Sequence, residues 1–232
     1  MFLDRARQLL LDRGYHGLTM DAIARLTGYS RGTIYLHFRC KEDLIMSLVN
    51  RGMTRRLDMV ERAAAFNGGT REQMQAIGEA VILFMSLYSG DARIFHVGDA
   101  EAIKQKASPS LLDEYNELLQ QTMSVAVGVI RNAIDAGDLV LQGRCTPEIL
   151  TFNLWAITEE GLSPPSTWAP FPELGIPDLL VSVLDGCEKL CDGCGWRPLS
   201  SEWDYEETRR RVREALFSEE TRQVLSPEAV MP

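Results

Sequence analysis

The sequence predicts an all-α fold, with an N-terminal three-helix helix-turn-helix domain and a larger C-terminal helical domain. Three observations support this prediction. Apolar residues recur at helical spacing along most of the 232 residues. Alternating apolar and polar runs between turn residues, which are typical of strands, are hard to find. Near the N-terminus, two short helical patterns flank a turn that contains Gly28, as a helix-turn-helix requires.

The individual helices are predicted from apolar periodicity and from capping residues. Gly14 is expected to end the first helix, and Thr19 and Ser30 can cap the next two. A long amphipathic helix follows over residues 41–65. The expected helices are 2–13, 20–26, 31–37, 41–65, 71–89, 91–106, 110–136, 147–161, 177–190 and 205–217.

We expect two domains, residues 1–48 and residues 49–225, linked by the long helix. Four prolines predict a loop over residues 163–172, because proline forbids regular backbone pairing. Pro177 suits the first position of a helix, and the tail from residue 226 to residue 232 is expected to fray.

The overall composition is that of an ordinary soluble globule, with 45% apolar and 25% charged residues. No apolar run approaches the roughly 20 residues that span a membrane. The first residues carry charges where a secretory signal needs an apolar block, so a cytoplasmic protein is expected.

The charge is unevenly distributed. A net charge of -9 argues against nucleic acid as a partner. However, residues 1–56 contain ten Arg or Lys and five acids, which gives this segment +5 and the remainder -14. A basic N-terminal segment on an acidic body indicates a polyanion partner for that segment, although uneven surface charge explains the same distribution equally well.

The helix-turn-helix pattern lies between residues 19 and 38. Ile23 and Leu26 on its first helix are expected to pack against Ile34 on the second. Gly28 supplies the left-handed turn conformation that strains other residues. Inside the second helix, Gly32 costs about 1 kcal/mol relative to Ala, and close approach of the backbone to a phosphate would offset that cost.

Residues 2–49 closely resemble the TetR (tetracycline-repressor) family of bacterial transcription regulators. The matching residues are Gly14-Tyr15-His16-Gly17, Ile23-Ala24, Gly28, Ser30, Gly32-Thr33-Ile34-Tyr35, His37-Phe38 and Lys41-Glu42-Asp43-Leu44. The resemblance implies a repressor that binds double-stranded DNA and is released from it by a small-molecule effector. It also implies that the C-terminal domain binds the effector and pairs two protomers.

On this basis the second helix enters a DNA groove. Arg31 and Thr33 would face base edges, while Ser30 and Lys41 would contact phosphates. Reading a palindromic operator requires two such helices about 34 Å apart, and hence a homodimer. The predicted DNA-binding residues are Thr19, Ser30, Arg31, Gly32, Thr33, Tyr35, His37 and Lys41.

The C-terminal domain offers a dimer seam and an effector pocket. The expected helices 147–161 and 177–190 have broad apolar surfaces, which suit either a four-helix seam between protomers or an ordinary internal core. Aromatic residues and Met suit a pocket for an apolar effector, but at helical spacing they are also typical of a core. The pocket candidates are Phe84, Tyr88, Phe95, His96, Met123, Phe152 and Trp155.

A cluster of cysteines suggests an alternative function, a metal- or redox-responsive regulator. Cys187 and Cys191 are four residues apart and share one helical face, and Cys194 follows where the chain could turn back. Three thiolates could converge on Zn²⁺ or another soft metal. Alternatively, Cys191 and Cys194 could cycle between dithiol and disulfide, or all three could be unligated thiols.

No pattern typical of an enzyme is present. The sequence lacks a Ser/His/Asp arrangement, a paired-carboxylate cleft and a phosphate-binding glycine loop. Of the three histidines, His16 and His37 lie in the N-terminal segment and His96 is isolated from them. We therefore expect no catalytic residue and no required cofactor.

Overall fold

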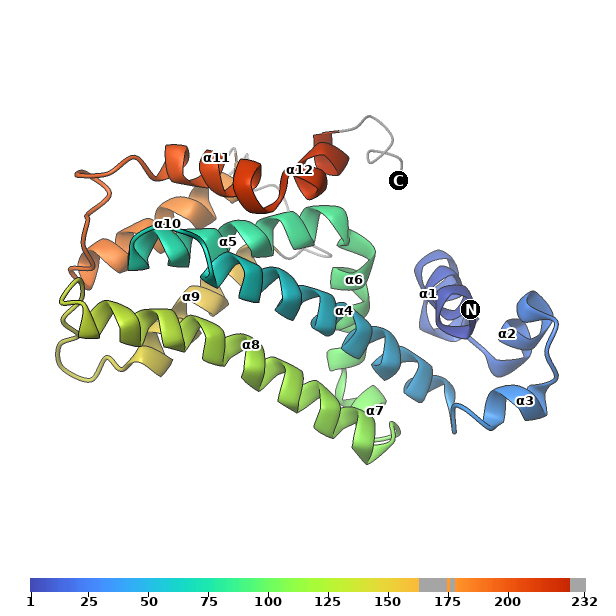
Figure 1. The fold of residues 1–232 in the computed structure, drawn as a ribbon. Helices are drawn as coiled ribbons and strands as arrows, with labels where there is room; N and C mark the ends of the chain where they lie inside the picture. The colour runs from blue at the N-terminus through green and yellow to red at the C-terminus, as the bar shows by residue number, and fades with distance from the viewer. Residues whose placement is uncertain (163–174, 176–177, 226–232) are drawn as a thin grey trace. The chain divides into compact units, whose positions relative to one another are not determined.

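The computed structural model describes residues 1–162, 175 and 178–225, and within these ranges every regular element is a helix (Figure 1), which confirms the all-α prediction. The helices are α1 (Phe2–Gly17), α2 (Met20–Thr27), α3 (Arg31–Tyr35), α4 (Lys41–Ala64), α5 (Thr70–Leu87), α6 (Ser89–Asp99), α7 (Glu101–Lys104), α8 (Pro109–Asp135), α9 (Pro147–Leu162), α10 (Leu179–Gly193), α11 (Tyr205–Leu216) and α12 (Ser218–Leu225). The predicted loop at 163–172, the helical start at Pro177 and the frayed tail at 226–232 lie outside the described residues.

The chain divides into two compact units. Unit 1 comprises Met1–Arg55 and Tyr88–Gln120, and unit 2 comprises Arg56–Leu87 and the described residues from Gln121 onward. Helices α4 and α8 therefore each continue along the chain from one unit into the other. Unit 1 is more extensive than the domain predicted for residues 1–48, because α6, α7 and the start of α8 contribute to its core. The functional boundary at residue 48 stays a prediction.

The predicted helix caps of the helix-turn-helix are confirmed. Thr19 Oγ1 accepts a hydrogen bond from the Ala22 N–H at 3.1 Å, and Ser30 Oγ accepts one from the Thr33 N–H at 3.1 Å. Gly28 ends α2 with a left-handed φ of 73°, as the turn requires. The local sequence thus fixes where both short helices begin and where the first one ends.

Several helix bounds differ from the predicted ones. Gly14 has a φ of 64° and interrupts α1, but the helix resumes and ends at Gly17. Helix α3 ends at Tyr35 instead of residue 37. The predicted helix 91–106 is two helices, α6 and α7, because Ala100 adopts an extended ψ of 128° between them.

The core of unit 1 forms around the first half of α4. Leu44 and Ile45 are fully buried there, as are Ile23 of α2 and Ile34 of α3. The predicted packing of Ile23 against Ile34 is consistent with this core, but the prediction for Leu26 is wrong. Leu26 is 47% exposed, since it lies on the outer face of α2. Burial of these apolar side chains holds α3 on the surface of the unit.

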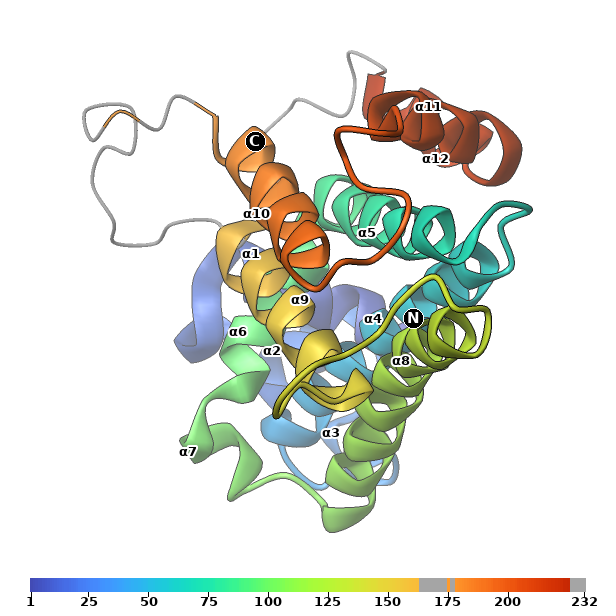
Figure 2. The same cartoon turned by 90° about the vertical axis from the view of Figure 1, so that its left-hand side faces the viewer.

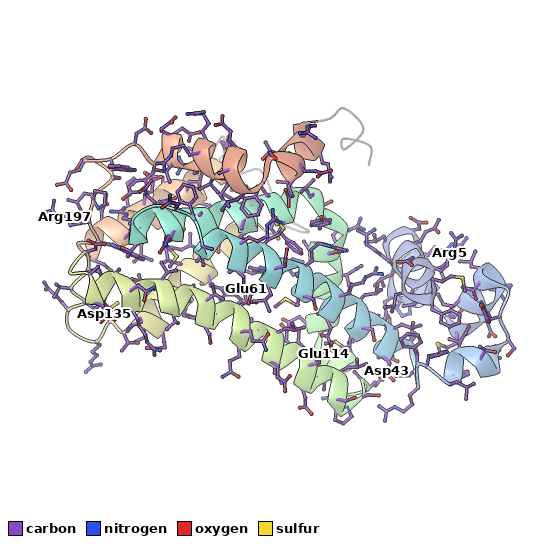
Figure 3. All side chains as sticks on the ribbon, viewed as in Figure 1. Arg5, Asp43, Glu61, Glu114, Asp135 and Arg197 are labelled. Atoms are coloured by element: carbon purple, nitrogen blue, oxygen red, sulfur yellow. The ribbon has the colours of Figure 1, made fainter. Side chains whose placement is uncertain are left out.

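Buried carboxylates connect the helices of unit 1. Asp91 of α6 accepts hydrogen bonds from Arg7 Nε at 2.8 Å and from Arg55 Nη1 at 2.6 Å. In the first turn of α4, Asp43 (labelled in Figure 3) accepts from the Ser108 N–H at 2.7 Å and the Arg39 N–H at 3.0 Å. These contacts join α1, α4 and the residues before α8 to one another.

Unit 2 is built around α5, which α11 and α12 cover (Figure 1). Helices α9 and α10 lie side by side in both views (Figures 1 and 2), and a β-carbon at Gly161 would clash with Val183 across their contact. Within the described residues no single helix is long and apolar enough to cross a bilayer. Among these residues, only the combined length and apolar composition of the two successive helices α5 and α6 would suffice.

Arg71 is the most extensively bonded side chain of unit 2. It is fully buried and pairs with Asp192 Oδ1 at 2.6 Å. It also donates to the carbonyl oxygens of Trp196, Pro198 and Glu188, at 2.6, 2.8 and 3.1 Å. These bonds attach the end of α10 and the segment after it to α5, and Trp196 in that segment is fully buried.

We predict that Arg71→Met lowers the free energy of unfolding by about 3–5 kcal/mol, because it leaves a carboxylate and several carbonyl groups without their donor. Arg210, which pairs on the exposed surface of α11, is the matched control. Arg210→Met should leave the free energy of unfolding unchanged within error, because exposed ion pairs contribute little. Urea denaturation of both variants measures the difference, and equal effects would contradict this account of Arg71.

Candidate functional site

Helix α3 presents most of its side chains to solvent. Arg31, Tyr35 and His37 are exposed, and Thr33 is half-buried. Leu36, which follows the helix, is 84% exposed, which is unusual for a large apolar side chain. The described surface of unit 1 thus carries a short helix. Hydrogen-bond donors and aromatic or apolar side chains on and directly after this helix face solvent instead of the core of unit 1.

Two of the predicted DNA-binding side chains have partners within unit 1. The guanidinium of Arg31 pairs with the carboxylate of Asp21 at 2.8 Å, and both side chains are about half exposed. Lys41 Nζ donates to the Tyr15 carbonyl oxygen at 3.0 Å and lies 3.5 Å from the centre of the Tyr15 ring. Both contacts lie near the surface, so Arg31 can exchange its partner for DNA more readily than the half-buried Lys41.

The Tyr15 side chain is held in place by α4. Its hydroxyl donates to Glu42 Oε1 at 2.6 Å, and this hydrogen bond to a carboxylate raises the pKa of Tyr15 to about 12. Tyr15 therefore stays protonated at neutral pH. The contact fixes the end of α1 against the start of α4, directly after the helix-turn-helix.

Gly32 leaves the backbone of α3 accessible. A β-carbon at this position would meet only Ser30 Oγ, at 3.7 Å, which is ordinary van der Waals contact. Packing within unit 1 therefore does not require glycine here. Close approach of another molecule to the α3 backbone remains the explanation that the sequence suggests.

Unit 2 encloses a cavity of about 90 Å³ between α4, α5, α8, α9 and α10. Its apolar lining residues are Val60, Met74, Ile77, Val81, Ile82, Met123, Ala126, Leu154, Trp155, Val183 and Leu184. Gly78 also lines it, and a β-carbon on Gly78 would meet no atom within 4 Å. The polar lining groups are Arg56, Gln75, Thr122, Thr151 and Thr158, and two thiols, Cys187 and Cys191, complete the wall.

One charged side chain lines the cavity, and it is paired with a carboxylate. Arg56 of α4 is 5% exposed, and its Nη2 donates to Glu159 Oε2 of α9 at 2.7 Å. Among the described residues, Arg56 Nε and Thr151 Oγ1 are both buried without a hydrogen-bond partner. Sequence analysis missed both residues, because an arginine or a threonine in a helical pattern gives no signal of burial.

The structure separates the predicted pocket residues. Met123 and Trp155 line the cavity, whereas Phe84 is fully buried in the core of unit 2 and Phe152 is 55% exposed. Tyr88, Phe95 and His96 belong to unit 1, where the Tyr88 ring lies 4.3 Å from the guanidinium of Arg55. Of the seven pocket candidates chosen for their aromatic or Met side chains, two thus line the cavity.

The three cysteines do not form the metal site that their spacing suggested. Within the described part of the chain, no group of three or more His, Cys, Asp or Glu side chains is placed to hold a metal ion. Burial raises the pKa of Cys187 to about 11 and that of Cys191 to about 12. Both thiols are therefore protonated at neutral pH in the metal-free protein, which makes them poor nucleophiles.

The predicted seam helices divide their apolar residues between the inside and the outside of unit 2. Leu154, Trp155, Val183 and Leu184 line the internal cavity. On the outer surface, Ile149 and Phe152 of α9 are 44% and 55% exposed, and Val181 of α10 is 59% exposed. Exposed apolar side chains thus remain on the outside of α9, near its start, and at the start of α10.

Comparison with known proteins gives consistent matches. The family model of bacterial regulatory proteins, tetR family, matches residues 2–48. The fatty acid metabolism regulator protein of Bacillus subtilis is 26% identical over 137 residues, which are 59% of this chain and 68% of that protein. The transcriptional repressor BepR of Brucella suis is 23% identical over 58% of this chain and 65% of its own length.

A solved structure agrees in fold. The regulator FadR from Bacillus subtilis, crystallised in complex with stearoyl-CoA, superposes with a TM-score of 0.62 and 20% identity. The match covers 83% of this chain and 97% of that chain. It therefore extends well beyond the residues that the family model matches.

Proposed function

Because residues 2–48 match the family model of bacterial regulatory proteins, tetR family, we propose that the chain is a ligand-responsive transcriptional repressor that binds operator DNA through α3. The observation that carries this proposal is the exposed α3, held on the core of unit 1 by Ile34 and presenting Arg31 and Tyr35, with His37 exposed directly after it. The named relatives are regulators, and we propose no catalytic role for this chain.

The charge distribution supports α3 as the DNA-binding surface. The chain as a whole carries -9, so DNA is repelled from most of its surface, whereas residues 1–56 carry +5. Arg31 is the side chain best placed to read bases, because its guanidinium is exposed and its present partner, Asp21, is exposed as well. Thr19, Ser30, Gly32, Thr33, Tyr35, His37 and Lys41 complete the proposed contact surface.

The effector would bind in the cavity of unit 2. At about 90 Å³ the cavity is well below the several hundred Å³ that ligand pockets usually have. A ligand that enters must therefore displace the surrounding helices. One of these is α4, whose first half lies in the core of unit 1 directly after the helix-turn-helix. Ligand binding and DNA binding would thus favour different positions of α4.

The apolar lining supports an apolar effector. A solved relative of similar fold carries stearoyl-CoA, a ligand with a long hydrocarbon chain. For this chain, the Met, Ile, Val and Leu side chains around the cavity favour a hydrocarbon portion in the same way. The metal- or redox-responsive alternative is not proposed, since no group of three or more metal-ligating side chains comes together among the described residues and Cys187 and Cys191 are protonated thiols.

We also propose that the protein is a homodimer joined through α9 and α10. Ile149 and Phe152 of α9 and Val181 of α10 are exposed apolar side chains, and burial against a twofold copy would remove them from water. A dimer also supplies the second α3 that a palindromic operator requires.

We predict that the protein binds DNA from its own upstream region, with an affinity that falls steeply as salt rises. Arg31→Ala should weaken this binding by about fivefold to 150-fold, the effect of losing one base contact. Arg131→Ala removes an arginine that is equally exposed and paired with Glu148, and it should leave the affinity unchanged. Fluorescence anisotropy measures both, and no binding at low salt, or equal effects of the two variants, contradicts the proposal.

For the effector site, we predict that Gly78→Leu abolishes binding of the neutral apolar dye N-phenyl-1-naphthylamine, because the new side chain fills the cavity. Gly128→Leu is the matched control, since Gly128 is also helical and open to a β-carbon but does not line the cavity. Dye fluorescence titration should show binding to the wild type and the control only. Dye binding to Gly78→Leu with wild-type affinity would place the effector elsewhere.

For the dimer, we predict that Phe152→Asp converts the protein to a monomer, because it buries two carboxylates against each other at a twofold interface. Val140→Asp changes a more exposed residue, 69% accessible, that lies outside α9 and α10. This control should stay dimeric. Sedimentation velocity distinguishes the two forms, and a wild-type protein that sediments as a monomer at micromolar concentration refutes the proposed seam.

A further inference from the structure

Two of the polar side chains that line the unit 2 cavity, Arg56 and Thr151, each have an atom without a hydrogen-bond partner in the described part of the chain. Arg56 is 5% exposed and Thr151 is 3% exposed, so both side chains are more than nine-tenths buried. Both line the cavity. Among the described residues, neither Arg56 Nε nor Thr151 Oγ1 has a hydrogen-bond partner. A buried polar group without a partner destabilises the fold, so each is a group that a bound molecule can satisfy.

The chemistry of these two groups selects an acceptor. The Nε–H of a guanidinium is a donor only, and a threonine hydroxyl can donate its proton to an oxygen. Two unused donors in an apolar wall therefore match a molecule that is mostly hydrocarbon but carries a hydrogen-bond acceptor. A pure hydrocarbon would leave both donors unpaired.

The charge balance of the cavity selects a neutral acceptor. Arg56 already pairs with Glu159, whose carboxylate accepts from Nη2 at 2.7 Å. The other side chains that line the cavity are uncharged, and Glu159, which lies outside the lining, compensates the charge of Arg56. A carboxylate ligand would add a negative charge without a partner, which is costly in a buried apolar site. A ketone, ester, amide or thioester oxygen adds none.

We propose that the effector is an apolar molecule with a neutral carbonyl group, whose oxygen accepts hydrogen bonds from Arg56 Nε and Thr151 Oγ1. This inference rests on the proposed function, because it assigns the chemical class of ligand to the cavity proposed as the effector site. It also places the polar end of the ligand against α4, since Arg56 belongs to that helix.

Helix α9 provides a matched control for the hydroxyl of Thr151. Thr158 lies seven residues further along the same helix, and it also lines the cavity. Its hydroxyl, however, already donates to the carbonyl oxygens of Leu154 or Trp155, each at 3.0 Å. Replacing Thr158 by Val therefore changes the cavity shape as little as the same change at Thr151, but removes no group available to a ligand.

The test compares octane, 2-octanone and octanoate as competitors of N-phenyl-1-naphthylamine on the full chain. Thr151→Val should weaken 2-octanone binding by about threefold to tenfold, the effect of one lost hydrogen bond, and should leave octane binding unchanged. Thr158→Val should change neither. The double variant Arg56→Met, Glu159→Leu should also weaken 2-octanone binding selectively, and the wild type should bind 2-octanone more tightly than octanoate.

Three results would overturn the inference. If Thr151→Val and Thr158→Val affect 2-octanone equally, the Thr151 hydroxyl does not receive the ligand. If octanoate binds more tightly than 2-octanone, the acceptor is anionic. In both cases the proposed effector site survives, because the apolar competitors still bind. If none of the three competitors displaces the dye, the inference and the proposed effector site fail together.

Discussion

The continuity of α4 is the constraint on which this account depends. At 24 residues the helix is about 36 Å long, and its backbone hydrogen bonds make it stiff along its axis. Leu44, Ile45 and Leu48 fix its first half in the core that carries α3, whereas Arg56 and Val60 in its second half line the cavity. In the proposed mechanism, a change at the cavity would act on the residues next to the helix-turn-helix through this one covalent element. Asp91 adds a second constraint, because it holds Arg55 of α4 and Arg7 of α1 together.

The side chains that line the cavity are mostly apolar, but two of their polar atoms have no hydrogen-bond partner among the described residues. Most of its lining is aliphatic, which contributes to the stability of unit 2 as any core does. The unpaired atoms of Arg56 and Thr151 work against that stability, and a core that served packing alone would have apolar residues there. The thiols of Cys187 and Cys191 belong to the same wall, where their protonated form behaves as an apolar group. The free energy of unfolding of unit 2 is therefore lower than it would be if apolar side chains replaced Arg56 and Thr151.

Features that depend on neighbouring residues were predictable from the sequence, and features that depend on distant ones were not. Thr19, Gly28 and Ser30 act within one turn of their own positions, so their roles followed from residue type and spacing. The four-residue spacing of Cys187 and Cys191 correctly predicted a shared face, but the sequence did not show that this face borders an apolar cavity. The predicted burial of Leu26 was wrong, because α2 carries apolar residues on both its inner and its outer face. The burial of Arg56 depends on α9, which lies about a hundred residues away in the chain.

The most direct test of the link between cavity and DNA is the reciprocity of their binding. The dissociation constant of N-phenyl-1-naphthylamine would be measured on the free protein and on the protein saturated with its upstream DNA. The DNA affinity would then be measured with and without saturating dye. The account predicts that each partner weakens the other by the same factor, of about fivefold to 150-fold, as thermodynamic linkage requires. Identical dye affinity in the free and DNA-bound protein, with both partners bound together, would contradict it.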